Sequence, residues 1–212
     1  MDSTSKTLVI GPAWVGDMVM AQSLCSYLKT QDPGIEISVV APANTAAIAR
    51  RMPAVHDVVE TTFAHGRLHL KARWRIGHSL KKKRFSQAFV LPGSFKAALV
   101  PFFAAIPLRT GYSGEPRWGL INDCRPKPQH KRDLMVDRFI NLARTKPSMQ
   151  NIAFPAPRLE ADLSAPQAIF RRLNKKIKAK PVLALCPGAE FGPAKQWPPA
   201  SFASLANHAT AH

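Results

Sequence analysis

The sequence predicts an α/β protein built on a parallel, doubly wound sheet of the Rossmann-like type. Two observations lead to this prediction. Short apolar runs alternate with stretches of helical spacing along the first half of the 212-residue chain, which is the pattern of a parallel sheet with helices on its faces. The first apolar run also leads into a glycine-bounded turn at residues 11–17, as a strand does when it feeds a helix in such folds.

Five strands are predicted in this half, at residues 7–10, 35–41, 55–61, 88–91 and 108–111. Four helices are predicted around them: one that follows Asp17 and is ended by Pro33 and Gly34, and three at residues 44–52, 94–107 and 133–144. Asn44 and Ser94 are placed as N-caps, because their side-chain oxygens can accept a hydrogen bond from a free N–H at a helix start. Pro53 is placed after the second helix, where a proline favours its end.

A proline-rich stretch divides the chain. Four prolines fall between residues 147 and 166 and no long apolar period survives there, so we predict a linker between a domain at residues 1–146 and a second one at 167–212. The second part begins with a helix at 168–178, followed by a strand at 181–186, a loop at 187–198 and a helix that continues through residue 206. An independent domain of this type needs about 100–150 residues. We therefore expect a C-terminally truncated chain, which holds only the beginning of a second Rossmann-like domain.

The composition predicts an anionic partner. Thirty Lys and Arg residues stand against 13 Asp and Glu residues, which gives a formal net charge of +17. Residues 67–84 concentrate the cations and interleave them with apolar side chains. This segment is either a solvated helix face or a basic, partly apolar lip that meets phosphates at a membrane surface.

Other compositional features exclude several classes of protein. Cys25, Cys124 and Cys186 are odd in number and far apart, so we expect reduced packing residues rather than disulfides or a metal site. No apolar run approaches the roughly 18–20 residues of a membrane span, and the first residues do not resemble a secretory signal. We therefore expect a cytoplasmic protein.

The turn at residues 11–17 presents a carboxylate where open α/β sheets bind their ligands. It fits neither the dinucleotide fingerprint nor the P-loop, since it lacks their glycine spacing and their lysine. Asp17 is either an ordinary helix cap or a catalytic base, and the positive end of the helix dipole favours its ionised form. The adjacent Gly16 allows a substrate to approach the backbone closely.

Two further connections carry candidate binding residues. Ser94 and Lys96 follow a later strand and either hold the oxygens of a substrate or serve as a plain cap and a solvated cation. Arg109 follows the next strand and adds positive charge. In the loop at 187–198, Gly188 and Lys195 can converge with backbone N–H groups on a phosphate, or form a mobile surface loop.

Four blocks of the sequence, taken together, resemble a known family. Residues 8–18, 91–103, 109–112 and 186–198 are similar to the ADP-heptose:lipopolysaccharide heptosyltransferases of glycosyltransferase family 9, and the last block is similar to the heptosyltransferase II branch. The resemblance implies a GT-B architecture of two Rossmann-like domains. It also implies an inverting transfer of L-glycero-D-manno-heptose from ADP-heptose to the first heptose of the lipopolysaccharide inner core.

The resemblance also implies roles for individual residues. Asp17 matches the catalytic base, and Gly188 and Lys195 match the site for the donor diphosphate. The remaining candidates fall on the acceptor side: Gly16, Ser94, Lys96 and Arg109. No metal ion and no cofactor are implied, because ADP-heptose is a substrate.

The implied partners are the nucleotide-sugar donor, the lipopolysaccharide acceptor and the anionic cytoplasmic face of the inner membrane of a Gram-negative cell, and no nucleic acid. The net charge of +17 leaves a different class of function open. In that alternative the chain is a non-catalytic basic module that binds anionic lipid or nucleic acid.

Overall fold

The structure is a computed structural model, and it describes residues 5–63, 66–127, 134–144, 156–162, 164–172, 182–189 and 192–211. The chain divides into two compact units, Met1–Ala161 and Asp162–His212. The predicted linker at 147–166 spans this division. Its residues 147–155 lie outside the described residues, and the part just before the division packs on the first unit: the Glu160 N–H donates to the Arg51 carbonyl at 2.7 Å.

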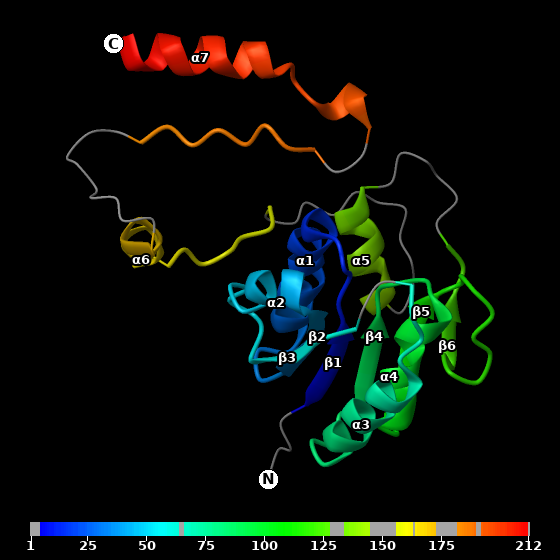
Figure 1. The fold of residues 1–212 in the computed structure, drawn as a ribbon. Coiled ribbons are helices and arrows are strands. Elements are labelled where there is room, and N and C mark those ends of the chain that lie inside the picture. Colours follow the sequence, from blue (N-terminus) through cyan, green and yellow to red (C-terminus); the bar gives the residue numbers. More distant parts are fainter. Residues whose placement is uncertain are drawn as a thin grey trace. The chain divides into compact units, whose positions relative to one another are not determined.

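The first unit contains a six-stranded sheet, in which every neighbouring pair of strands is parallel (Figure 1). The spatial order is β3-β2-β1-β4-β5-β6. The strands are β1 (Lys6–Ile10), β2 (Glu36–Pro42), β3 (Asp57–Thr61), β4 (Gln87–Val90), β5 (Leu108–Tyr112) and β6 (Asp123–Arg125). The order reverses between β1 and β4, which is the point where doubly wound sheets open a crevice for a ligand.

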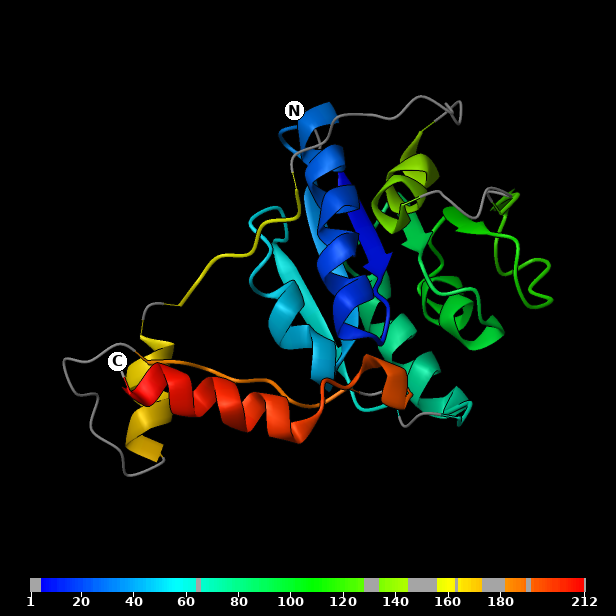
Figure 2. The same cartoon turned by 90° about the horizontal axis from the view of Figure 1, so that it is seen from above.

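Helices cover both faces of this sheet (Figure 1; Figure 2). One face carries α1 (Val15–Gln31), α2 (Ala43–Ala49) and α5 (Met135–Ala143), and the other carries α3 (Leu70–Lys81), the 3-10 helix η1 (Phe95–Ala98) and α4 (Leu99–Phe103). Side chains alternate between the faces along a strand. In β1, Val9 therefore packs in the α1 cluster, whereas Leu8 and Ile10 pack in the cluster formed with η1 and α4.

The five predicted strands are present within a few residues, but two predicted helix starts were wrong in detail. The N-cap residue of α2 is Pro42, and Asn44 lies inside the helix, where its amide donates to the Ala13 carbonyl at 2.9 Å. Ser94 does occupy the N-cap of η1, but its hydroxyl makes no capping hydrogen bond. The predicted helix at 94–107 is η1 followed by α4, which ends at Phe103. The short edge strand β6 was not predicted.

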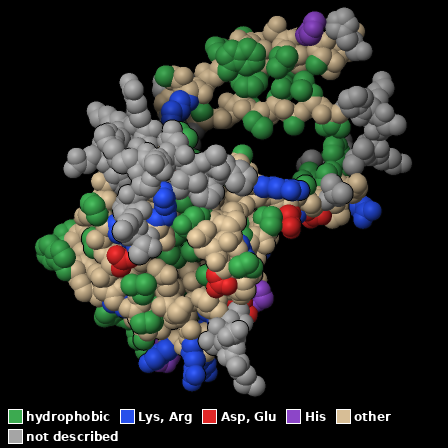
Figure 3. All heavy atoms as spheres, turned by 180° about the vertical axis from the view of Figure 1, so that it is seen from behind, with side chains coloured by type: hydrophobic (Ala, Val, Ile, Leu, Met, Phe, Trp, Pro, Cys, Tyr) green, Lys and Arg blue, Asp and Glu red, His purple; other side chains and the backbone are tan. Residues whose placement is uncertain are grey.

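The second unit contains α6 (Ala165–Arg172), the 3-10 turn η2 (Pro193–Lys195) and α7 (Pro199–Ala211). The strand predicted at 181–186 is not formed in residues 182–186. A strand is stable only when a neighbour accepts its hydrogen bonds, and the described part of this unit has no other strand. None of the unit's described residues is buried, and Figure 3 shows hydrophobic side chains at its surface. The second half of the predicted helix at 168–178 lies outside the described residues.

A helix must be both long and apolar to cross a bilayer. Within the described residues, no helix combines the two well enough to cross a membrane.

Candidate functional site

A pocket of about 570 Å³ lies at the carboxyl edge of the sheet, where the strand order reverses. The connections that follow β1 and β4 form much of its wall, and residues of β2, β3, α3 and α5 complete it. Three sequence-predicted residues meet here: Asp17, Ser94 and Lys96. Because β1 and β4 are neighbours, two segments about 80 residues apart in sequence face the same cavity.

Asp17 lies in the first turn of α1 and lines the pocket. The N-cap position belongs to Trp14, whose carbonyl accepts the first helical hydrogen bond from Met18 at 2.9 Å. Within the described residues, the Asp17 carboxylate takes part in no hydrogen bond or ion pair. The capping interpretation is therefore not supported, and the carboxylate is available to accept a proton or a hydrogen bond from a ligand.

Ser94 and Lys96 enter the pocket from the connection between β4 and η1. The free N–H of Phe95 at the start of η1 donates to the Glu115 carboxylate at 2.7 Å, so a distant acidic residue caps this helix in place of Ser94. The Ser94 hydroxyl is thereby left available for a ligand. Glu115 itself lines the pocket and was not singled out from the sequence.

Arg73 of α3 fixes the position of Lys96. Its guanidinium is buried, with only 6% of the residue exposed, and lies 4.0 Å above the ring of Phe63. It donates to the carbonyl of Lys96 at 3.0 Å and to that of Leu68 at 2.7 Å. Burial lowers the pKa of this guanidinium from its ordinary value. Arg73 also lines the pocket, and the sequence placed it only within a basic segment.

Arg117 binds the start of the connection between β4 and η1. It is 5% exposed and donates to the carbonyls of Pro92 at 2.8 Å, Ser94 at 3.4 Å and Tyr112 at 2.5 Å. Burial lowers the pKa of its guanidinium. No sequence pattern distinguishes Arg117 from a surface arginine, since its partners are all backbone carbonyls of other segments.

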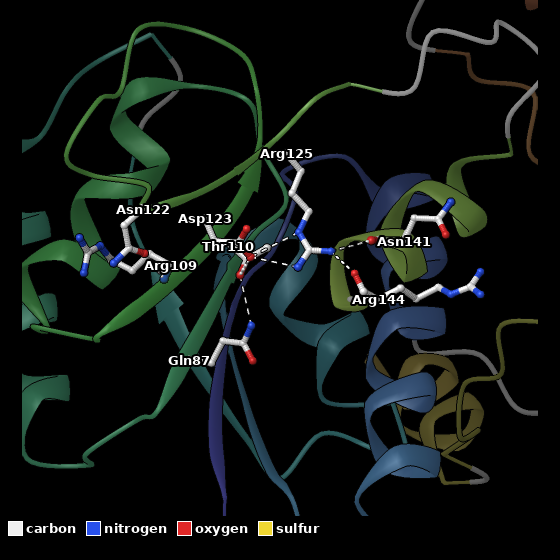
Figure 4. Close-up of polar contacts among 8 residues, drawn as sticks. All are labelled: Gln87, Arg109, Thr110, Asn122, Asp123, Arg125, Asn141 and Arg144. Carbon is white, nitrogen blue, oxygen red and sulfur yellow. Dashed lines mark hydrogen bonds and ion pairs between the residues drawn. The ribbon is translucent and has the colours of Figure 1, made fainter. Parts of the chain in front are cut away.

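A polar network at the edge of the sheet ties α5 to the strands (Figure 4). The Asp123 carboxylate accepts from the Thr110 hydroxyl at 2.8 Å and from the Arg125 guanidinium at 3.0 Å. Arg125 also donates to the carbonyl of Asn141 in α5 at 3.2 Å. Because α5 contributes Phe139 to the pocket, the short strand β6 contributes to the pocket's shape.

Two other sequence-predicted residues lie outside the lining of the pocket. The Arg109 guanidinium is occupied by three carbonyls, those of Ile106 at 2.5 Å, Leu120 at 2.6 Å and Gly119 at 3.1 Å. The structure therefore uses Arg109 to hold the connection between β5 and β6. Gly16 is exposed in the first turn of α1, and apart from its chain neighbours and the backbone of its own helix, no described atom lies within 4 Å of where its Cβ would stand. Its role toward a substrate stays a prediction.

The second unit presents Gly188 and Lys195 to solvent. Gly192 has a positive φ of 75°, and its carbonyl accepts from the Lys195 N–H at 3.1 Å. The Gln196 amide donates to the Ala189 carbonyl at 3.3 Å, which folds the loop onto itself. The roles of Gly188 and Lys195 toward a diphosphate stay predictions.

In the described part of the chain, no group of three or more His, Cys, Asp or Glu residues could hold a metal ion. All three cysteines are free. Burial raises the pKa of the Cys25 thiol to about 12, so it is an inert packing residue as expected. Cys124 and Cys186 are exposed, which corrects the expectation that they pack in a core.

The fold and the pocket define a Rossmann-like α/β protein with a pocket at the carboxyl edge of a parallel sheet, where proteins of this class bind their ligands. Residues 73–212 match the family model for glycosyltransferase family 9 (heptosyltransferase). The chain belongs to this family.

Individual relatives agree with this assignment. The chain is 45% identical over 205 residues to lipopolysaccharide heptosyltransferase 2 of Salmonella typhimurium and equally to that of Escherichia coli, covering 95% of the chain. The solved structure of the E. coli ADP-heptose heptosyltransferase II matches with a TM-score of 0.83 and 41% identity, over 97% of this chain and 61% of that one. These findings confirm the predicted fold class and give no support to a non-catalytic basic module. The chain spans 59% of the length of the curated relatives it matches.

Proposed function

We propose that this chain acts in lipopolysaccharide core biosynthesis as a heptosyltransferase II. The reaction transfers L-glycero-D-manno-heptose from ADP-heptose to the first heptose of the inner core. The observation that carries the proposal is the meeting of Asp17, Ser94 and Lys96 in one pocket of a chain that belongs to this family. The names of the relatives, heptosyltransferase 2 and ADP-heptose heptosyltransferase II, supply the substrate class.

The proposed chemistry begins at Asp17. Its carboxylate takes the proton of an acceptor hydroxyl while that oxygen attacks the anomeric carbon of the donor heptose. The bond between this carbon and the diphosphate oxygen breaks, ADP leaves, and the configuration at the anomeric carbon inverts. Support comes from the position of Asp17 in the pocket wall and from the absence of a competing partner among the described residues. Ser94 and Lys96 orient the acceptor sugar and its anionic groups.

The donor side of the proposal rests on Gly188 and Lys195. A cation beside the diphosphate offsets the charge that develops on the leaving ADP, and a glycine lets backbone N–H groups approach phosphate oxygens. Both residues are exposed in a loop that its own hydrogen bonds shape. The proposal assigns no metal ion and no cofactor to this reaction.

The proposed place of action is the cytoplasmic face of the inner membrane. The acceptor is an anionic lipid, and its core sugars and phosphates match the excess of cations in this chain. No nucleic acid is assigned as a partner.

The test is a transfer assay with the gene product that contains this chain. ADP-heptose is mixed with a core acceptor that carries one heptose, and mass spectrometry follows the acceptor. The expected product gains one heptose residue. The matched control is an acceptor without heptose, which should remain unchanged. Transfer to the heptose-free acceptor alone, or transfer to neither, would overturn the proposed substrate.

A further inference from the structure

Exposed apolar side chains are unevenly distributed over the two faces of the first unit. Among the described residues, the layer that contains α3, η1 and α4 exposes six large ones, and the layer of α1, α2 and α5 exposes three near its helix starts. The six are Leu68, Leu70, Trp74, Phe95, Phe102 and Trp118. Trp118 is 91% exposed, on a loop whose neighbours Leu120 and Ile121 pack with α4. Water-exposed aromatic groups on one layer mark an interaction surface.

The same layer carries a one-sided charge. Between Glu60 and Glu115 the chain has ten Lys and Arg residues and no Asp or Glu. This stretch forms α3, β4, η1, α4 and β5, and Arg109 is the cation that lies in β5. Lys83 forms an ion pair with Asp57, and Arg73 is buried, but the other cations of α3 and the turn after it are exposed. Figure 3 shows Lys and Arg side chains gathered at the lower end of the first unit.

Helix α3 mixes both kinds of side chain on its outer face. Its core-facing side consists of Arg73, Gly77 and Leu80. The opposite side, at helical spacing, presents Lys71, Trp74, Arg75, His78 and Lys82, all of them exposed. The Trp74 ring stacks on His78, with ring centroids 5.3 Å apart. A nucleic acid would contact only the cations of this face. A bilayer interface would contact the cations and also accommodate the tryptophan and leucine side chains.

We propose that this layer docks on an anionic lipid bilayer. The docking surface consists of Leu70 and Trp74 in α3, Phe102 in α4, Trp118, and the surrounding Lys and Arg residues. The apolar side chains enter the headgroup region and the cations bind lipid phosphates. The inference deepens the proposed function, on which it rests, because it assigns the membrane contact to particular elements.

The docking surface is joined directly to the pocket. Arg73 belongs to α3 and donates to the Lys96 carbonyl, and Lys96 lines the pocket. Phe95, next to Lys96, is one of the exposed apolar residues. The end of the docking surface that holds Arg73 and Phe95 therefore lies beside the pocket, whereas Lys83 at its other end pairs with Asp57 at the start of β3.

The test compares binding of the full chain to vesicles of phosphatidylethanolamine with phosphatidylglycerol and to vesicles of phosphatidylcholine alone. Sedimentation measures the bound fraction. We expect binding to the anionic vesicles only, weakened by salt. The double variants Trp74→Ala/Trp118→Ala and Lys81→Glu/Lys82→Glu should each bind roughly tenfold more weakly or worse. The matched controls are Leu134→Ala and Arg158→Glu, which alter exposed residues outside this layer and should bind like the wild type.

Two results would overturn the docking surface. One is equal loss of vesicle binding in the control variants and the layer variants. The other is tighter binding of the chain to duplex DNA than to anionic vesicles. Circular dichroism of each variant shows that the fold is retained.

A separate readout distinguishes this inference from the proposed function. With a water-soluble core oligosaccharide as acceptor, the Trp74→Ala/Trp118→Ala variant should transfer heptose at the wild-type rate. Loss of transfer in the wild type would refute the proposed function and leave the vesicle result intact. Loss in the variant alone would show that these tryptophans serve the pocket rather than the bilayer.

Discussion

The two units of the chain differ in what holds them together. In the first, two apolar clusters enclose the sheet, and the arginines that shape the pocket are buried. In the second, no described residue is buried, and local hydrogen bonds such as Lys195 to Gly192 set the loop geometry. The difference teaches that the proposed acceptor side is fixed by tertiary packing, whereas the proposed donor residues lie on locally folded segments. Substitutions in the two units should therefore have separable effects.

The largest expected effect is on catalysis in the first unit. Asp17→Asn keeps the shape of the side chain and removes its ability to take a proton, so heptose transfer should fall roughly 10²- to 10⁴-fold. Steady-state kinetics on the gene product measures this. Stability should fall by no more than about 1 kcal/mol, the contribution of a first-turn carboxylate to the helix dipole. Turnover close to that of the wild type would remove Asp17 as the base.

The contrast in packing can be tested with one matched pair of truncations. Leu24 in α1 is fully buried, whereas Leu205 in α7 is 41% exposed. Leu24→Ala should lower the free energy of unfolding by about 2–5 kcal/mol, since it removes buried contacts and leaves a cavity. Leu205→Ala should change it by about 0.5 kcal/mol or less. Urea unfolding followed by circular dichroism measures both. Equal losses would contradict the difference between the units.

Arg117 offers a test of how the pocket wall is held. Arg117→Met removes the guanidinium from three carbonyls, of which that of Ser94 keeps the N–H of Ala97, and stability should fall by about 1–3 kcal/mol. The KM for the acceptor should rise, because the connection that carries Ser94 loses its support. Arg109→Met is the matched control, since it also frees three carbonyls but lies outside the pocket lining. It should lose similar stability and keep the KM. A raised KM in both variants would mean that Arg109 contacts the acceptor.

A substitution at Gly16 should raise stability and weaken binding of the acceptor. Glycine costs a helix about 0.5–1 kcal/mol relative to alanine, and nothing in the structure occupies the space of a Cβ at this position. Gly16→Ala should therefore raise the free energy of unfolding by about that amount. If the acceptor approaches this backbone as predicted, its KM should rise. A stabilised variant with unchanged kinetics would exclude Gly16 from the acceptor site.

The smallest expected effect concerns the pH dependence of stability in the first unit. The hydrogen bond from Lys83 lowers the pKa of Asp57 below its ordinary value. The pair therefore stabilises the fold above the unfolded pKa, and this contribution is lost as pH falls through the lower folded pKa. Asp57→Asn should flatten the decline of stability below about pH 4 and change little at pH 7. Thermal melts across this range measure it, and an unchanged acid slope would contradict the assignment.

Five of the six strands could be predicted from the sequence because the pattern that indicates each of them is local. Each of the five predicted strands is a short apolar run followed by turn residues. The strand β6 has only three residues, Asp123–Arg125, and is polar; its contacts with Thr110 and α5 come from elsewhere in the chain. The strand predicted at 181–186 failed for the converse reason: its residues favour a strand, but pairing needs a neighbour that the described part of the second unit does not supply.

The same distinction applies to the site. Asp17, Ser94 and Lys96 could be predicted because each follows a strand end, and the topology makes those strands neighbours. Arg73 and Arg117 could not, because a buried arginine that binds carbonyls looks in sequence like any surface cation. Arg109 was expected at the acceptor; its guanidinium binds three carbonyls between β5 and β6, and its role toward the acceptor stays a prediction.

The close crossing of α3 and α4 bears on how far the pocket lies from a docked membrane. A Cβ at Gly77 would lie 2.5 Å from the Cβ of Phe103 and 2.7 Å from the Val100 carbonyl oxygen, so the two helices meet backbone to backbone. The two helices are closely packed, and Arg73 of α3 donates a hydrogen bond to the carbonyl of Lys96 in the pocket wall. If this pair of helices docks on the bilayer, the distance between the pocket and the lipid surface is fixed. A heptosyltransferase that acts as proposed would then select its acceptor by the length of its sugar chain as well as by its chemistry.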